Sequence, residues 1–219
     1  MVTIVPTINV TTQEKFVSQL RDAELLCDLV QIDVADGEFT AWKSWNEPEV
    51  IKDIQTGARY EVHLMVKDVE REIARWSVVQ NIQRMIIHFE SFIEKQQFYS
   101  LINKLVVEAG WEIGVALNPD TPIEALEPIA DKINYVMLLG VNPGLSGQSM
   151  QDSVIDKIQD LRIAYPDVNI EIDGGINETN ARSVVMAGAN ILCMGAGIFN
   201  DKASVKENYN KFKALCTTF

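Results

Sequence analysis

The chain has 219 residues, a length that fits one large domain or two small ones. Its hydrophobic fraction of 47% allows a large core, and no apolar run approaches the roughly 20 residues of a membrane span. The formal net charge of −12 argues against nucleic acid or an anionic membrane as a partner, so an anionic ligand would have to be held by local donors.

Strand-like and helix-like segments alternate along the whole chain. The expected strands are short apolar runs at residues 4–8, 29–34, 60–66, 84–88, 111–117, 133–141, 169–173 and 191–194. A capping box at Thr11 to Glu14 predicts the first helix, with Phe16, Leu20 and Ala23 at helical spacing. Further helices are expected at residues 49–55, 69–78, 92–109, from 121, at 152–165, 180–187 and from about 204.

This alternation predicts an α/β fold in which residues 1–219 form one domain, a single (β/α)8 TIM barrel. Near-continuous apolar strands suit a parallel sheet that is covered on both faces, and no linker interrupts the eight strand–helix units. The alternative is an open doubly wound sheet. That fold usually has fewer units and a glycine-rich turn after its first strand, where this chain has Asn9-Val-Thr-Thr12.

Two features of the sequence bear on the cellular location of the protein. The N-terminal residues 1–6 have no basic flank and no cleavage-site pattern, so no signal peptide is expected. The three cysteines, Cys27, Cys193 and Cys216, are an odd number at no metal-like spacing. Reduced thiols in a cytoplasmic protein are the expectation.

Polar residues stand where the expected strands end. Asp33 interrupts one apolar run and Asp173 ends another, although aspartate is a poor strand former and is almost never buried unpaired. In a barrel these ends meet at the face that carries the active site. The full set, which includes both histidines of the chain, is Asn9, Asp33, His63, His88, Asn118, Asn142, Asp173 and Gly195.

Glycines follow the last three expected strands, at residues 144–147, 174–175 and 195–197. Glycine lets the backbone approach a ligand closely, and backbone N–H groups can cradle phosphate oxygens. Binding through backbone dipoles would explain how so acidic a protein holds an anion. The alternative is that these glycines serve only their turns.

The two aspartates and a histidine suit proton transfer at a carbon next to a carbonyl. Asp33 and Asp173 could remove a proton from one face of a substrate and return it to the other. Together with His63 they could also hold a divalent ion that stabilises the enolate. The alternative is that both aspartates are buried structural acids, bonded to backbone or lysine.

Seven motifs, in order and nearly end to end, resemble the ribulose-phosphate 3-epimerase family, the ketose-phosphate 3-epimerases. They are IDVADG (32–37), VHLMV (62–66), IHFE (87–90), ALNPDTP (116–122), VNPGLSGQ (141–148), IDGGI (172–176) and GAGIF (195–199). The resemblance implies a barrel of the ribulose-phosphate-binding type. It also implies an enzyme that interconverts ribulose 5-phosphate and xylulose 5-phosphate, and by analogy a homo-oligomer.

The resemblance also implies roles for individual residues. Asp33 and Asp173 would be the acid/base pair, acting through a cis-enediolate, and His63 would join them as ligands of one divalent ion, Zn, Fe, Mn or Co. Thr7 falls where the family has a serine that contacts substrate. The residues implied to hold the phosphate are Gly144, Leu145, Ser146, Gly147, Gly174, Gly175, Gly195 and Ala196.

The chain departs from the family pattern at several positions of the expected site. Gln31 stands where the family has a histidine as fourth metal ligand, and an amide oxygen is a weaker ligand than imidazole for zinc-like ions. Met65 remains, but Ala35 and Leu139 replace two other methionines, and Ala196 replaces a serine of the phosphate loop.

Three readings follow from these departures. The chain is a 3-epimerase with a weaker or three-ligand metal site, an epimerase for another ketose phosphate such as a hexulose phosphate, or a non-catalytic sugar-phosphate-binding protein. Retention of both aspartates and His63 favours the first two. Trp42 and Trp45, which follow the first acidic motif, could serve an interface or a pocket.

Overall fold

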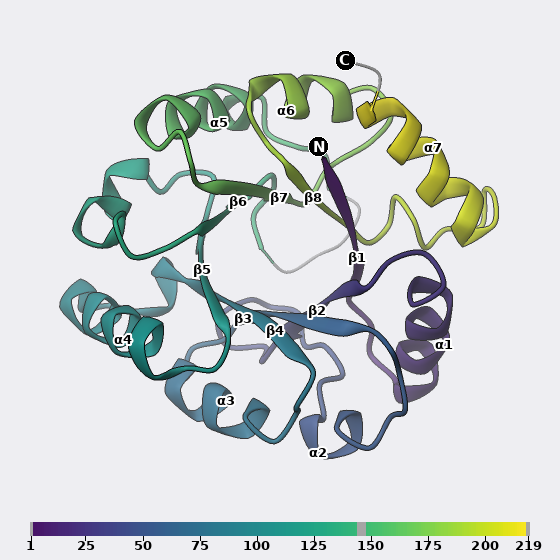
Figure 1. Ribbon diagram of the computed structural model, residues 1–219, viewed down its shortest axis with the longest axis horizontal. Coiled ribbons are helices and arrows are strands. Elements are labelled where there is room, and N and C mark those ends of the chain that lie inside the picture. The colour runs from purple at the N-terminus through teal and green to yellow at the C-terminus, as the bar shows by residue number, and fades with distance from the viewer. Residues whose placement is uncertain (1, 144–147, 218–219) are drawn as a thin grey trace.

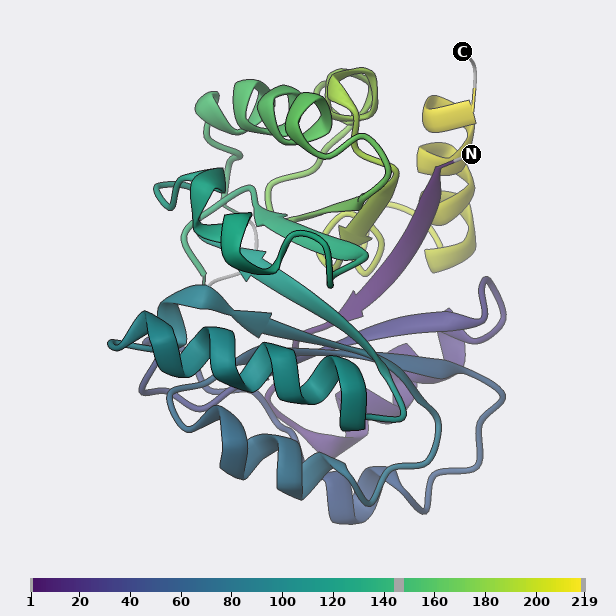
Figure 2. The same ribbon diagram turned by 60° about the vertical axis from the view of Figure 1, so that its left-hand side comes forward.

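The computed structural model describes residues 2–143 and 148–217, and the structural statements below concern these residues. Eight parallel strands close into a barrel in the order β1 to β8, with β8 paired to β1. Helices surround the strands on the outside (Figure 1), and the turned view shows the same outer layer from the side (Figure 2). The predicted (β/α)8 barrel is confirmed, and the open doubly wound alternative is wrong.

Each strand is followed by a helical element before the next strand begins. The strands are β1 (Thr3–Ile8), β2 (Leu29–Ala35), β3 (Arg59–Met65), β4 (Ile82–His88), β5 (Glu112–Leu117), β6 (Tyr135–Leu139), β7 (Asn169–Asp173) and β8 (Ile191–Met194). The helices are α1 (Gln13–Ala23), α2 (Pro48–Ile51), α3 (Val69–Trp76), α4 (Lys95–Glu108), α5 (Ser153–Ala164), α6 (Ala181–Ala187) and α7 (Val205–Thr217), with 3₁₀ helices η1 (Phe89–Ser91) and η2 (Ile123–Ile129).

The helices differ from the sequence expectation at three points. Thr12, and not Thr11, caps α1, where its hydroxyl accepts a hydrogen bond from the Lys15 N–H at 3.3 Å. The helix expected near residues 49–55 is the single short turn α2. The element expected from residue 121 is the 3₁₀ helix η2, because Pro128 inside it lacks an N–H and cannot continue an α-helix.

The apolar strands bury their side chains on two sides, in agreement with the predicted parallel sheet. In β2, Val30, Ile32 and Val34 belong to the large core between strands and helices. Gln31 and Asp33 alternate with them and therefore point into the barrel. Polar residues thus occupy the interior of a strand whose outer face is apolar.

Side chains from the strands form a second, smaller apolar cluster. Its buried members are Val5, Ile86, Ala116, Met137, Leu139, Ile191 and Cys193. No helix among the described residues combines the length and the apolarity needed to cross a membrane.

Candidate active site

A cavity of about 540 Å³ opens at the C-terminal ends of the strands, the face where the sequence placed the site. Both predicted acids line it, together with side chains from the ends of other strands. The strand-end residues that line the cavity include Thr7, Asn9, Asp33, Met65, Leu139, Asp173 and Gly195.

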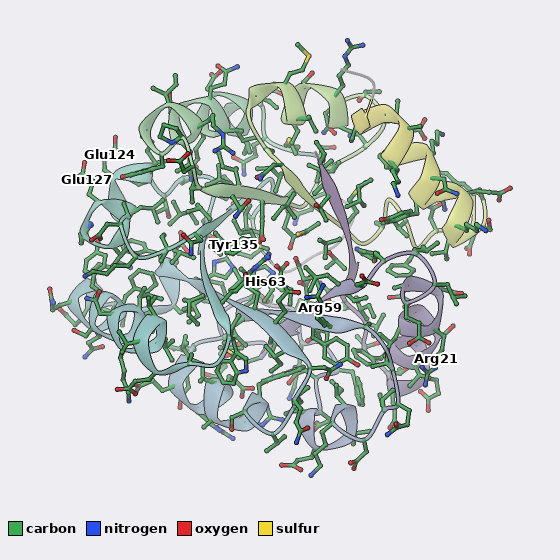
Figure 3. The ribbon with its side chains drawn as sticks, in the orientation of Figure 1. Arg21, Arg59, His63, Glu124, Glu127 and Tyr135 are labelled. Carbon is green, nitrogen blue, oxygen red and sulfur yellow. The ribbon has the colours of Figure 1, made fainter. Side chains whose placement is uncertain are left out.

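Asp33 and Asp173 line this cavity, His63 lies buried against both of them, and Figure 3 shows His63 near the centre of the ring of strands. Asp33 and His63 are register partners on β2 and β3, and Asp173 arrives from β7. Nδ1 of His63 lies 3.0 Å from Oδ1 of Asp33 and 3.3 Å from Oδ2 of Asp173. One ligand atom from each residue lies within 4.8 Å of the others, a spacing that could hold a metal ion.

Gln31 bridges the two aspartates. Its Nε2 donates to Oδ1 of Asp33 and to Oδ2 of Asp173, both at 2.8 Å, and its Oε1 is buried with no hydrogen-bond partner among the described residues. Amide and imidazole side chains thus hold the two carboxylates, and neither backbone nor lysine donors contact them in the described part of the chain.

Burial and charge shift the protonation of this cluster. Burial raises the pKa of Asp33, and the charge of Asp173 raises it further, while the hydrogen bonds of His63 and Gln31 act in the opposite direction. Burial alone would lower the pKa of His63, but the hydrogen bonds and charges of Asp173 and Asp33 outweigh it and raise the pKa to about 10. The site therefore pairs its acids with an imidazolium.

A hydrogen-bonded chain leads from His63 to Glu90 and supports the same protonation state. Nε2 of His63 lies 2.9 Å from Nε2 of His88, and Nδ1 of His88 lies 3.2 Å from Glu90. Burial would raise the pKa of Glu90, but the bond from His88, with those from Thr121 and the Asn118 N–H, lowers it to about 2.

Because Glu90 is ionised, it can only accept, so Nδ1 of His88 carries a proton and donates it in this hydrogen bond, and Nε2 of His88 is left as an acceptor. Nε2 of His63 must then donate across the contact between the rings, while Nδ1 of His63 donates to Asp33. Protons on both ring nitrogens make His63 the cation of the pair, and burial together with this charge lowers the pKa of His88.

Part of the expected phosphate subsite lies in the described chain. Gly174 and Gly175 have φ angles of 96° and 72°, which favour glycine, and a Cβ on Gly175 would lie 2.4 Å from the Met150 backbone nitrogen. Gly195 and Ala196 line the same cavity. Gly144, Leu145, Ser146 and Gly147 lie outside the residues that the structure describes.

Three further side chains of the cavity lining bear on ligand binding: Thr7, which was expected from the sequence, and two lysines, which were missed. Thr7 lines the cavity with a buried hydroxyl that has no partner among the described residues. Two lysines also line it: Lys211 pairs with Glu178 at 2.5 Å, while the amine of Lys202 has no ion pair in the described part of the chain. Lys202 therefore offers an uncommitted positive charge to an anionic ligand.

A second charged layer lies one step deeper in the barrel and was also missed. The buried Arg84 pairs with the buried Glu61 and Glu171, and its guanidinium lies 3.4 Å from the centre of the Tyr135 ring. Burial raises the pKa of both glutamates. Glu61 stands two residues before His63, and Glu171 two residues before Asp173. Because residues two apart on a strand point to the same face, this spacing could have predicted that both glutamates point into the barrel.

The fold and the site define a (β/α)8-barrel protein with an acid–histidine centre at the C-terminal ends of its strands. A sequence model described as the ribulose-phosphate 3 epimerase family matches residues 3–199. The chain belongs to the ribulose-phosphate 3-epimerase family.

Curated relatives support this membership. The chain is 34% identical to a chloroplastic ribulose-5-phosphate-3-epimerase of Arabidopsis thaliana over 206 residues, which covers 90% of this chain and 71% of that protein. It is 31% identical to a ribulose-phosphate 3-epimerase of Bacillus subtilis over 91% of this chain and 93% of that one.

Solved structures are similar in fold alone. An orotidine 5'-phosphate decarboxylase from Pyrococcus horikoshii superposes with a TM-score of 0.67 at 15% identity and covers 99% of this chain and 100% of its own. A thiamine phosphate pyrophosphorylase from Pyrococcus furiosus gives 0.63 at 12% identity, over 98% of this chain and 95% of its own.

Proposed function

We propose that the chain is a ketose-phosphate 3-epimerase that interconverts ribulose 5-phosphate and xylulose 5-phosphate. The observation that carries this proposal is the convergence of Asp33 and Asp173, from strands that are not neighbours, on one cavity with His63 in contact with both. The relatives named above are epimerases of this substrate class, which supports the same reaction.

The proposed substrate binds with its phosphate at the glycine turns. The backbone at Gly174, Gly175, Gly195 and Ala196 would approach the phosphate oxygens, and Lys202 would add a charge at the same end of the cavity. The Thr7 hydroxyl, which has no partner among residues 2–143 and 148–217, would donate to an oxygen of the sugar. This arrangement directs the sugar toward the two aspartates.

One aspartate removes the C3 proton as a base, and the other, in its protonated form, delivers a proton to the opposite face of the same carbon. The electrons of the broken C–H bond pass to the carbonyl oxygen, which gives a cis-enediolate, and they return to C3 when the new C–H bond forms. Burial and the charge of Asp173 raise the pKa of Asp33, which helps one member of the pair to carry a proton. The positive charge on His63 stabilises the anionic site during the transfer.

A divalent ion fits the same residues. Two carboxylates and an imidazole nitrogen converge within 4.8 Å, and Gln31 has a buried oxygen without a partner among the described residues. Asp33, Asp173 and His63 in its neutral form would hold the ion, which would take the place of the Nδ1 proton of His63. Gln31 would join them as a weak fourth donor only with its amide turned, because its Nε2 and not its Oε1 faces the two carboxylates. When bound, the ion would supply charge stabilisation for the enediolate oxygens.

The second candidate is an epimerase for another ketose phosphate, such as a hexulose phosphate. Leu139 favours it, because this side chain lines the cavity where the family has a methionine. A change of shape at the cavity wall alters which sugar chain fits and leaves the two aspartates in place.

The test is incubation of the protein with ribulose 5-phosphate in deuterated water, with added Zn, Fe, Mn or Co and without metal. The proposal expects xylulose 5-phosphate that carries deuterium at C3. A hexulose phosphate in a parallel reaction decides between the two candidates. Tight binding of both sugars without exchange at any metal loading would favour the non-catalytic reading.

A further inference from the structure

Asn9, directly after β1, connects a tryptophan of another loop to one of the proposed catalytic aspartates. Its Oδ1 accepts a hydrogen bond from Nε1 of Trp42 at 2.7 Å, and its Nδ2 donates to Oδ2 of Asp33 at 2.9 Å. Trp42 stands in the loop after β2, so three sequence-distant groups form one continuous chain of hydrogen bonds.

The loop that carries Trp42 is fixed at several points. The Thr40 hydroxyl accepts from the Trp42 N–H at 3.2 Å and donates to the Trp42 carbonyl at 3.0 Å. The Trp45 N–H donates to the Val10 carbonyl at 2.7 Å, which ties the loop to the residue after Asn9. Hydrogen bonds to the backbone of the loop therefore help to hold the Trp42 side chain beside Asn9, in addition to the hydrogen bond of its ring nitrogen.

The chemistry of the three groups allows one orientation of the Asn9 amide. An indole N–H can only donate, so Trp42 needs the amide oxygen. An ionised Asp33 can only accept, so it needs the amide nitrogen. A reversed amide would set its oxygen against the carboxylate and its nitrogen against the indole, and both hydrogen bonds would be lost.

The two oxygens of Asp33 have different surroundings. Oδ1 accepts from Nε2 of Gln31 and lies 3.0 Å from Nδ1 of His63, so both of its lone pairs are engaged. Oδ2 accepts only from Asn9 among the described residues and keeps one lone pair. Because Asp33 lines the cavity and both lone pairs of Oδ1 are engaged, the proton transfer is assigned to Oδ2.

We propose that Trp42 is a positioning residue for Asp33 and acts through Asn9: the indole sets the Asn9 amide, and the amide aims the free lone pair of Asp33 Oδ2 at the substrate. The proposal rests on the proposed function, in which Asp33 transfers the C3 proton. It assigns the loop after β2 a part in the orientation of the acid, beyond any interface or pocket role for its tryptophans.

The test compares Trp42→Phe with the matched control Trp45→Phe, a change of the same kind in the same loop whose ring packs against Phe16. Loss of the indole N–H from Trp42 should lower kcat about tenfold with KM changed less than about twofold, because misplacement of a reacting group lowers the rate of the chemical step. The control should keep kcat within about twofold. Unchanged kcat in Trp42→Phe would overturn the proposal.

A double-mutant cycle separates positioning from a general structural effect. If Trp42 acts through Asn9, Trp42→Phe adds less than about a twofold effect in an Asn9→Ala background. If the two effects simply multiply, Trp42 acts by another route and the proposal is wrong.

The indole N–H resonance of Trp42 provides a readout without turnover. Asn9→Ala and Asp33→Asn should both shift this resonance, while the Trp45 indole resonance stays in place as the internal reference. An unmoved Trp42 resonance in both variants would contradict the hydrogen-bonded chain. If the wild-type protein exchanges the C3 proton of no ketose phosphate, the proposed function is wrong. The Trp42 resonance then still tests whether the hydrogen bonds from Trp42 through Asn9 to Asp33 exist.

Discussion

Glu90 should contribute stability that disappears in acid. Its half-buried carboxylate accepts hydrogen bonds from His88, from Thr121 and from the Asn118 N–H, which lower its pKa from the ordinary 4.5 to about 2 despite partial burial. Since the folded-state pKa is depressed, the contribution is complete above about pH 4.5 and is lost as the pH falls toward 2. A difference of about 2.5 pKa units corresponds to about 3 kcal/mol.

Urea unfolding of the wild type and Glu90→Gln at about pH 6 and about pH 3.5 measures this effect. The difference in free energy of unfolding between the two proteins should be smaller by about 1–1.5 kcal/mol at the lower pH. At that pH Glu90 binds a proton in the unfolded state but stays ionised in the folded state, which favours unfolding of the wild type. Glu108→Gln, at an exposed position of α4, is the control and should show no such narrowing. A gap that stays constant between the two pH values would refute the assignment of the low pKa to Glu90.

Three further predictions concern the metal ligands, the buried charges and the phosphate end of the cavity. Gln31→His should raise the content of divalent metal measured by elemental analysis, because imidazole is a better donor than an amide oxygen. Arg84→Met should lower the free energy of unfolding by about 3–5 kcal/mol, because it leaves Glu61 and Glu171 buried without their cation. Lys202→Gln should raise KM for the ketose phosphate about five- to tenfold with kcat changed less than about twofold, because it removes one charged contact to the phosphate.

Each of these predictions has a matched control. Gln31→Leu removes the amide and should not gain metal, so an equal gain in both variants would contradict the ligand argument. Arg84→Lys keeps the charge and should lose less stability than Arg84→Met. Lys206→Gln removes the same charge from an exposed site of α7 outside the cavity lining, and an equal rise in KM there would show a general effect of net charge.

The barrel and the place of the site could be predicted from the sequence because they depend on local signals. Apolar runs of strand length alternate with helical spacing, and an acid inside such a run, as at Asp33, marks an inward-facing position at a strand end. The helix expected from residue 121 was wrong in type, because Pro128 decides between α and 3₁₀ geometry.

The hydrogen-bonded partners could not be predicted, because side-chain contacts across the barrel depend on three-dimensional packing. Asn9 and Trp42 are 33 positions apart, and neither residue type by itself indicates the other. Likewise, the two histidines were expected at strand ends, but the 2.9 Å contact between their Nε2 atoms follows only from the packing of β3 against β4.

The central claim is that Asp33 and Asp173 act on opposite faces of one carbon, and exchange of the C3 proton with deuterated water tests it most directly. The measurement starts separately from ribulose 5-phosphate and from xylulose 5-phosphate, with Asp33→Asn and with Asp173→Asn. We predict that each variant retains exchange with one epimer only, that the two variants retain opposite epimers, and that neither forms the epimerised product. Exchange from both epimers in either variant would contradict the account, because a single carboxylate would then serve both faces.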